Sequence, residues 1–193
     1  MKQVKIGRLL FHDKILSANR NIACATCHSH ELGGSDGLSL GIGEGGAGIG
    51  LKRTAGIGDD KIKKRVPRNA LALWNLGFKD ITTLLHDGRV TKSNIFGNGF
   101  NTPAQEALPK GLNNIVAVQA LFPMTRQFEM AGNPGENEII GLVSKVGKDS
   151  MRIDRVWPVI THRIRGIPEY VELFKNGFDD VDSALDINIT HIV

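Results

Sequence analysis

Both cysteines of the chain lie in one short run, CATCH (Cys24 to His28), with a histidine directly after the second cysteine. A structural zinc site needs four ligands, and the sequence holds no second Cys-x-x-Cys and no His-x-x-x-His. A thioredoxin-like dithiol would follow a strand in a βαβ pattern, which is missing as well. Cys-x-x-Cys-His is the attachment signal of c-type haem, in which the histidine binds the iron. We therefore predict one covalently bound c-type haem on Cys24, Cys27 and His28, and we interpret His30 as a surface residue.

Composition limits the classes of protein to which the chain can belong. Its 193 residues are 41% hydrophobic and 23% charged, which is ordinary for a globular domain. No apolar run is long enough for a transmembrane helix, so we expect no membrane span. The net charge of +4 is too mild to indicate binding of nucleic acid. Residues 1–8 lack the features of a signal peptide, so we expect either a removed leader or a piece of a longer protein.

The hydrophobic periodicity indicates a mainly α fold. Apolar residues recur at helical spacing, and Pro168 stands where the first turn of a helix tolerates proline. Residues 31–65 are rich in glycine and basic side chains without a period, which predicts a long irregular loop. Both tryptophans, Trp74 and Trp157, are expected to pack in the core. The expected helices are 4–11, 24–28, 69–76, 81–86, 113–122, 136–146, 154–165, 168–176 and 181–193.

Five segments, in order along the chain, resemble those of the bacterial di-haem cytochrome c peroxidases and their methylamine-utilisation relatives. They are GRLLFHDKILSANRNIACATCHSHELGGSDG (7–37), VPRNALALWN (66–75), LLHDGRV (84–90), FPMTRQFEM (122–130) and IRGIPEYVELFKNGF (164–178). The resemblance implies a cytochrome c-like helical haem domain with long Gly-rich irregular loops. It also implies that residues 1–193 are the N-terminal peroxidatic haem domain, with the start of the connection to a second haem domain that is absent from these residues.

The same resemblance implies a function. Family members are oxidoreductases of the periplasm, the side on which c-type haem is attached, so we expect the mature protein there by analogy. Hydrogen peroxide or O₂ is expected to bind at the iron, with electrons from a second haem domain or a donor cytochrome. A calcium ion between the two haem domains and a homodimer belong to the same expectation.

Glu129 takes its expected role from the resemblance. It matches the acid that assists cleavage of the peroxide O–O bond, where a carboxylate within hydrogen-bond reach can shuttle the proton. From the residues alone, a surface carboxylate paired with Arg126 is an equally good interpretation.

Arg68 and Asn69 match an Arg-Asn pair of the family. Asn69 corresponds to a calcium ligand, and its alternative role is the N-cap of the helix expected at 69–76. Arg68 is the residue that we expect to bind a haem propionate. The remaining basic cluster, which includes Arg53, is interpreted mainly as a solvated face.

The sequence departs from the family at three places. Only one Cys-x-x-Cys-His is present, Ile42 stands where classical members have a loop histidine, and His86 replaces the tryptophan between the haems. An iron with His28 on one side and no protein ligand on the other stays open to peroxide, and this is the state that we predict. The alternative is a mono-haem electron-transfer cytochrome whose sixth ligand is His86 or one of the methionines Met124, Met130 and Met151.

Overall fold

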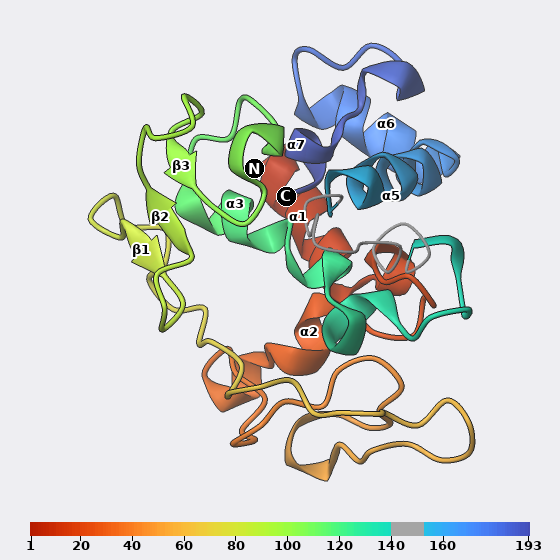
Figure 1. Cartoon of the computed structure of the whole chain (residues 1–193). Coiled ribbons are helices and arrows are strands. Elements are labelled where there is room, and N and C mark those ends of the chain that lie inside the picture. Colours follow the sequence, from red (N-terminus) through yellow and green to blue (C-terminus); the bar gives the residue numbers. More distant parts are fainter. Residues whose placement is uncertain (140–152) are drawn as a thin grey trace.

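The computed structural model describes residues 1–139 and 153–193, and its longest helices pack together (Figure 1). Helix α1 (Lys2–His12) lies against α6 (Pro168–Gly177), and α5 (Val156–Arg165) contacts both α6 and the short α7 (Ile189–Ile192). In α1 the buried residues are Ile6 and Leu10, four positions apart on one face. The helices expected at 4–11, 154–165 and 168–176 are therefore confirmed.

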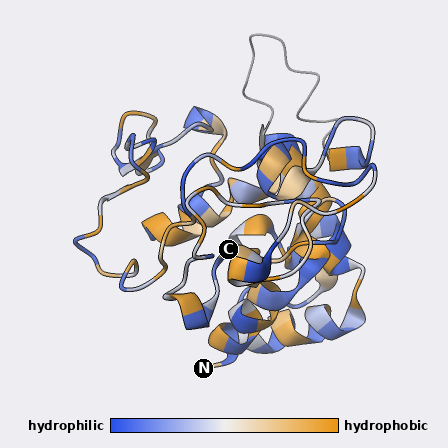
Figure 2. Ribbon diagram, turned by 90° about the horizontal axis from the view of Figure 1, so that it is seen from below, coloured by the Kyte–Doolittle hydropathy of each residue, from blue (hydrophilic) through white to orange (hydrophobic). Residues whose placement is uncertain are grey.

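The hydrophobic core lies among α1, α5, α6 and α3 (Ile115–Ala120). Phe174 of α6 and Ile160 and Ile164 of α5 are completely buried in it. Trp157 is buried as well, and its Nε1–H donates to the carbonyl oxygen of Leu121 at 3.0 Å, which confirms its expected place. Figure 2 shows hydrophobic and hydrophilic residues together on the long helices, as amphipathic helices that cover a core require.

A small antiparallel sheet is the element that the sequence analysis missed. It consists of β1 (Thr83–Leu84), β2 (Val90–Lys92) and β3 (Phe100–Asn101) in chain order. The helix expected at 81–86 is therefore wrong. Leu85 has φ +65° and Gly88 has φ +66°, so the chain reverses through an Asp-Gly dipeptide, which favours hairpins. Strands β1 and β2 contact α3, and the buried residues Leu84 and Val90 pair with each other.

The segment 69–76 also differs from the expectation of a helix. It contains turns and no helix, and Asn75 has φ +61°. Trp74 is 56% exposed and contacts the ring of His30 at a centroid distance of 5.4 Å, so its expected place in the core is wrong. Leu71 and Leu73 are exposed too. A short apolar segment without a surface to pack against gains too little to hold a helix.

The remaining elements are short. The helix expected at 24–28 is confirmed as α2 (Cys24–Cys27), and that at 113–122 as α3. The helix expected at 181–193 is wrong over most of its length, because Ser183 and Asn188 each cap a new short element, a 3₁₀ turn at Ala184–Asp186 and α7. The helix expected at 136–146 falls largely outside the described residues. Other short elements are 3₁₀ turns at Lys14–Leu16, His30–Leu32, Gly50–Lys52, Gln105–Ala107, Pro123–Thr125 and Ile153–Arg155, and a π-helical turn at Gln127–Ala131.

Residues 33–65 run beneath α2 as extended loops in the lower part of Figure 1. They contain the 3₁₀ turn Gly50–Lys52 and no α-helix, and isolated bridges join Gly41 to Val66 and Ala47 to Thr54. The fold is thus a helical core with a small sheet and long connections. Among the described helices, none has the length and hydrophobicity that crossing a membrane would need.

Candidate haem site

Helix α2 presents the two cysteines of the CATCH run on a single turn. The turn is closed by hydrogen bonds from the backbone N–H of Ala23 to Thr26 Oγ1 at 3.1 Å and from the N–H of His28 to the carbonyl of Cys24 at 3.0 Å. Residues three apart on a helix share one face, so both thiols of Cys24 and Cys27 are available to one flat ligand. Both cysteines are free and partly buried.

The surroundings of the thiols argue against a redox dithiol. Burial raises the pKa of the Cys24 thiol. Burial also raises the pKa of Cys27, to about 11, although the positive charge of Arg53 opposes this. A thioredoxin-type cysteine needs the opposite, a pKa lowered toward neutrality. The raised pKa values of Cys24 and Cys27 are therefore unlike those of a thioredoxin-type dithiol.

His28 is oriented by the loop that follows it. Its Nδ1 donates to the carbonyl oxygen of Gly34 at 2.9 Å, which leaves Nε2 as the nitrogen with a free lone pair. Metal-binding histidines characteristically donate their second ring N–H to such an acceptor. Gly34 has φ +76°, and a Cβ built there would lie 2.8 Å from the backbone nitrogen of Leu73. The arrangement of His28 thus fits the proximal ligand of a haem iron.

Glu129 lies on the π-helical turn Gln127–Ala131, which packs against the Gly-rich loop. The backbone N–H of Glu44 donates to the carbonyl oxygen of Glu129 at 2.9 Å. A Cβ built on Gly43 would overlap the carbonyl oxygen of Phe128, so only glycine allows this approach of the two backbones. The loop beside the haem motif and the segment of Glu129 are thereby held together.

The carboxyl group of Glu129 is in an unusual environment. Burial raises its pKa, while the positive charges of Arg126 and Arg89 oppose the rise. The charge of Glu129 in turn contributes to the raised pKa of Cys27, so the two side chains are electrostatic neighbours. Arg126 and Glu129 form no ion pair within 4.0 Å, so the interpretation of Glu129 as a paired surface carboxylate finds no support in this geometry.

The turn between β1 and β2 contributes a second charged pair. Arg89 forms an ion pair with Asp87 at 2.6 Å, and its side-chain hydrogen bond lowers the pKa of Asp87 to about 2. His86, in the position of the family tryptophan, is exposed. Because Arg89 also lowers the pKa of Glu129, this turn acts electrostatically on the candidate site.

Arg68 and Asn69 lie at the surface. Arg68 has φ +75°, and its carbonyl oxygen accepts from the N–H of Gly41 at 3.3 Å. The Asn69 amide donates to the carbonyl of Leu38 at 2.6 Å and accepts from Ser35 Oγ at 3.1 Å. Asn69 therefore braces a loop, and its alternative role as a helix N-cap is wrong because no helix begins there. Within residues 1–139 and 153–193, no group of at least three His, Cys, Asp or Glu side chains could hold a metal ion.

The candidate sixth ligands are distributed through the fold. Met124 is 2% exposed and Met130 5% exposed, and both belong to the hydrophobic core. Ile42 is buried, and its carbonyl oxygen lies 3.9 Å from Cys27 Sγ. Met151 lies outside the described residues.

Arg53 and Asp36, two of the three charged residues that are buried in the Gly-rich stretch, were not anticipated as parts of the site. Arg53, assigned by the sequence analysis to a solvated basic face, is buried and donates to three backbone carbonyls. Asp36 is completely buried, and its Oδ2 has no hydrogen-bond partner. Neither position carries a local signal, since both lie in a Gly-rich stretch with several other charged residues.

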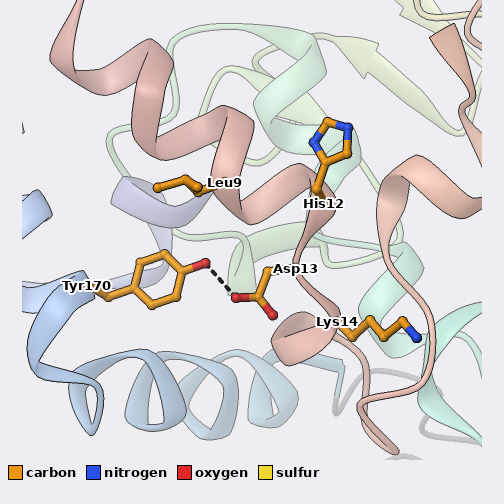
Figure 3. A pocket seen from close by; sticks show the side chains of 5 residues that line it. All are labelled: Leu9, His12, Asp13, Lys14 and Tyr170. Carbon is orange, nitrogen blue, oxygen red and sulfur yellow. Dashed lines mark hydrogen bonds between the residues drawn. The ribbon is translucent and has the colours of Figure 1, made fainter.

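A shallow hollow lies away from these residues, where the end of α1 faces α6 (Figure 3). Its lining comprises Leu9, His12, Asp13, Lys14 and Tyr170, and none of them was predicted to be functional. The Tyr170 hydroxyl donates to Asp13 Oδ2 at 2.7 Å, a contact that ties α6 to α1 (Figure 3).

Two known proteins are similar in sequence to short segments of this chain. A segment of 46 residues is 48% identical to the cytochrome c peroxidase Ccp of Escherichia coli (strain K12). This segment makes up 24% of this chain and 10% of that protein. A segment of 44 residues is 46% identical to the methylamine utilization protein MauG of Methylorubrum extorquens, and it makes up 23% of this chain and 12% of that protein.

A solved structure and a family profile cover the whole chain. The crystal structure of a MauG-like protein associated with microbial copper homeostasis is 20% identical, with a TM-score of 0.44. The alignment covers 100% of this chain and 39% of that one, so this chain spans well under half of that relative. The profile of the family described as di-haem cytochrome c peroxidase matches residues 1–193. The chain therefore belongs to the di-haem cytochrome c peroxidase family.

Proposed function

We propose that residues 1–193 form the haem domain that reduces hydrogen peroxide within a larger di-haem oxidoreductase of the periplasm. Electrons would come from a second haem domain outside these residues or from a donor cytochrome. Family membership over the whole chain supports a haem-dependent redox function. The arrangement of Cys24, Cys27, His28 and Glu129 supports the specific reaction.

Cys24 and Cys27 would hold the haem through thioether bonds, and His28 would bind its iron through Nε2. When bound, the haem supplies an iron at which the O–O bond of peroxide is broken and electrons are delivered. The contact of His28 Nδ1 with the Gly34 carbonyl fixes the ring orientation that this requires and makes the free nitrogen more basic.

Glu129 would move the proton. Cleavage of hydrogen peroxide with both bonding electrons going to one oxygen requires that this oxygen receive a proton and leave as water. A carboxylate in reach can take a proton from one peroxide oxygen and return it to the other. Burial raises the pKa of Glu129, which brings a carboxyl group closer to the pH at which such a shuttle works well.

The observation that carries the proposal is the packing of the Glu129 segment against the loop that also contacts Cys27: the N–H of Glu44 donates to the carbonyl oxygen of Glu129 at 2.9 Å, and the carbonyl oxygen of Ile42 lies 3.9 Å from Cys27 Sγ. In the haem-loaded full-length protein, Glu129→Gln should lower the rate of peroxide reduction by about 10²–10⁴-fold, the usual contribution of a proton-transfer group. Glu106→Gln, which changes an exposed glutamate, is the matched control and should leave the rate unchanged. Equal rates for Glu129→Gln and the control would contradict the assignment.

We propose further that the iron keeps an open coordination position. Ile42 stands where classical family members have a loop histidine, and its side chain has no atom that could bind iron, which supports this. The optical spectrum of the resting protein should show a high-spin iron. A low-spin spectrum that reverts to high spin in His86→Ala would instead identify an electron-transfer cytochrome.

A further inference from the structure

The side chain of Arg53 is buried against the Gly-rich segment 42–48 and forms no ion pair with a carboxylate of the described residues. Its side chain donates from all three nitrogens to backbone carbonyl oxygens: Nε to Ile42 at 2.6 Å, Nη2 to Gly43 at 2.6 Å and Nη1 to Gly48 at 2.7 Å. Burial of a charge is costly unless its donors are satisfied. Here the carbonyl groups of a single loop accept from all three nitrogens of the Arg53 guanidinium. The position of the guanidinium and the conformation of the loop therefore depend on each other.

The glycines of the segment allow this close packing. A Cβ built on Gly46 would overlap Ile42 Cγ2 and lie 2.9 Å from Arg53 Nη2. The N–H of Gly46 also donates to the carbonyl of Gly43 at 3.2 Å. The segment is therefore a tight turn built around a guanidinium, and a side chain at position 46 would push the two apart.

The same segment joins the haem motif to Glu129. The Ile42 carbonyl that accepts from Arg53 lies 3.9 Å from Cys27 Sγ. Two residues further, the N–H of Glu44 donates to the carbonyl oxygen of Glu129 at 2.9 Å. Arg53 thus donates to the carbonyls of Ile42 and Gly43, which lie directly before the residue that contacts Glu129.

The far side of the turn is anchored as well. Glu44 is 6% exposed, and its Oε1 accepts from the amides of Asn19 at 2.8 Å and Asn21 at 2.5 Å. The segment before the haem helix therefore fixes one end of the turn, and Arg53 fixes its interior.

We propose that Arg53 is a positioning residue, whose planar guanidinium holds residues 42–44 between the haem helix and Glu129 and so keeps the Glu129 carboxyl in its partly buried place. The proposal rests on the proposed function in one respect, the role of Glu129 as the proton-transfer group. In this role, the geometry of the Arg53 donors matters as well as the charge of its side chain.

Geometry and charge can be separated by substitution. Arg53→Lys keeps the positive charge, but a single ammonium cannot replace donors fixed in a planar fork. Arg53→Met removes both charge and donors. Gly46→Ala leaves Arg53 intact and displaces the turn from it. The control is Arg65→Lys, because Arg65 makes one exposed hydrogen bond to the carbonyl of Leu40 in the same loop.

The experiment uses the haem-loaded full-length protein and two measurements. Hydrogen exchange at residues 42–46 should be about tenfold faster or more in Arg53→Lys, Arg53→Met and Gly46→Ala, the factor expected when a backbone hydrogen bond is lost. The acid limb of the pH–rate profile for peroxide reduction should move to lower pH by about 0.5–1 unit, because water reaching Glu129 reduces the effect of burial. Arg65→Lys should change neither quantity.

The outcomes distinguish the two proposals. Wild-type exchange and a wild-type pH profile in Arg53→Lys would show that charge alone suffices and would overturn the role of the fork. Faster exchange with an unchanged pH profile in all three variants would reduce Arg53 to a structural residue and overturn the positioning role. An unaltered rate in Glu129→Gln would overturn the proposed function itself, whatever the exchange data show. Thermal unfolding of each variant confirms that the compared proteins are folded, and Gly46→Ala provides the test if Arg53→Met does not fold.

Discussion

Replacing Gly43 by alanine should separate the Gly-rich loop from the segment of Glu129. A Cβ at this position would overlap the carbonyl oxygen of Phe128 and lie 2.9 Å from that of Glu129. Both obstacles are backbone atoms, so no side chain can rotate away. The backbones must move apart, and the hydrogen bond from Glu44 N–H to the Glu129 carbonyl, 2.9 Å long, is lost.

The magnitude follows from these two effects. Overpacking costs about 1–3 kcal/mol, and the lost hydrogen bond adds about 1 kcal/mol, so the free energy of unfolding should fall by about 2–4 kcal/mol. For a chain of this size, that corresponds to a melting temperature lower by about 4–16 °C. Chemical denaturation followed by circular dichroism measures the free energy, and differential scanning calorimetry measures the melting temperature.

Gly7→Ala is the matched control, because it is the same substitution at an exposed position of α1. A Cβ at Gly7 meets nothing within 4 Å, and alanine favours a helix over glycine by about 0.8–1 kcal/mol. Gly7→Ala should therefore stabilise the protein while Gly43→Ala destabilises it. If Gly43→Ala were as stable as the wild type, the inferred close approach of the loop to residues 128–129 would be refuted.

Two further predictions concern titrating groups. Arg89→Gln removes a positive charge that lowers the pKa of Glu129, so the acid limb of the pH–rate profile should move to higher pH. The pKa of Asp87 should also return from about 2 toward its ordinary value. An unshifted acid limb would show that Arg89 does not act on the site. Tyr170→Phe should cost about 1 kcal/mol through the lost hydrogen bond to Asp13. Because burial and this bond raise the pKa of Tyr170, their stabilisation is complete below about pH 10, the ordinary pKa of tyrosine, and is lost as the pH rises toward the folded-state pKa. Unfolding free energies measured across the alkaline range should show this decline in the wild type and a smaller one in Tyr170→Phe, and equal slopes would contradict the assignment.

The sequence was sufficient for features whose cause is local. The CATCH run specifies its own chemistry, since two thiols and a histidine at this spacing suit one ligand. Helices α1, α5 and α6 were predicted because their apolar residues recur on one face and Pro168 marks a start. The order of five family-like segments along the chain was also sufficient to identify the family that the profile confirms.

The errors occurred where the local pattern was ambiguous. The segment at 81–86 is apolar enough for a helix, yet it forms β1 and a turn because β2 and α3 offer it a partner. Trp74 is a residue type that is usually well buried, but here it contacts the ring of His30 and stays 56% exposed.

The candidate site itself was decided by tertiary structure. Nothing in the sequence distinguishes Arg53 from its basic neighbours, because its burial depends on three carbonyls that converge only when the loop is closed. Likewise, glycine at position 43 is required by the backbone of Phe128, a residue distant in sequence. A sequence pattern indicates local structure, whereas the contact between the Gly-rich loop and Glu129 joins two segments that are distant in sequence. The sequence alone was thus sufficient to predict a c-type haem on the CATCH run, and the folded structure decided which side chains lie around that run.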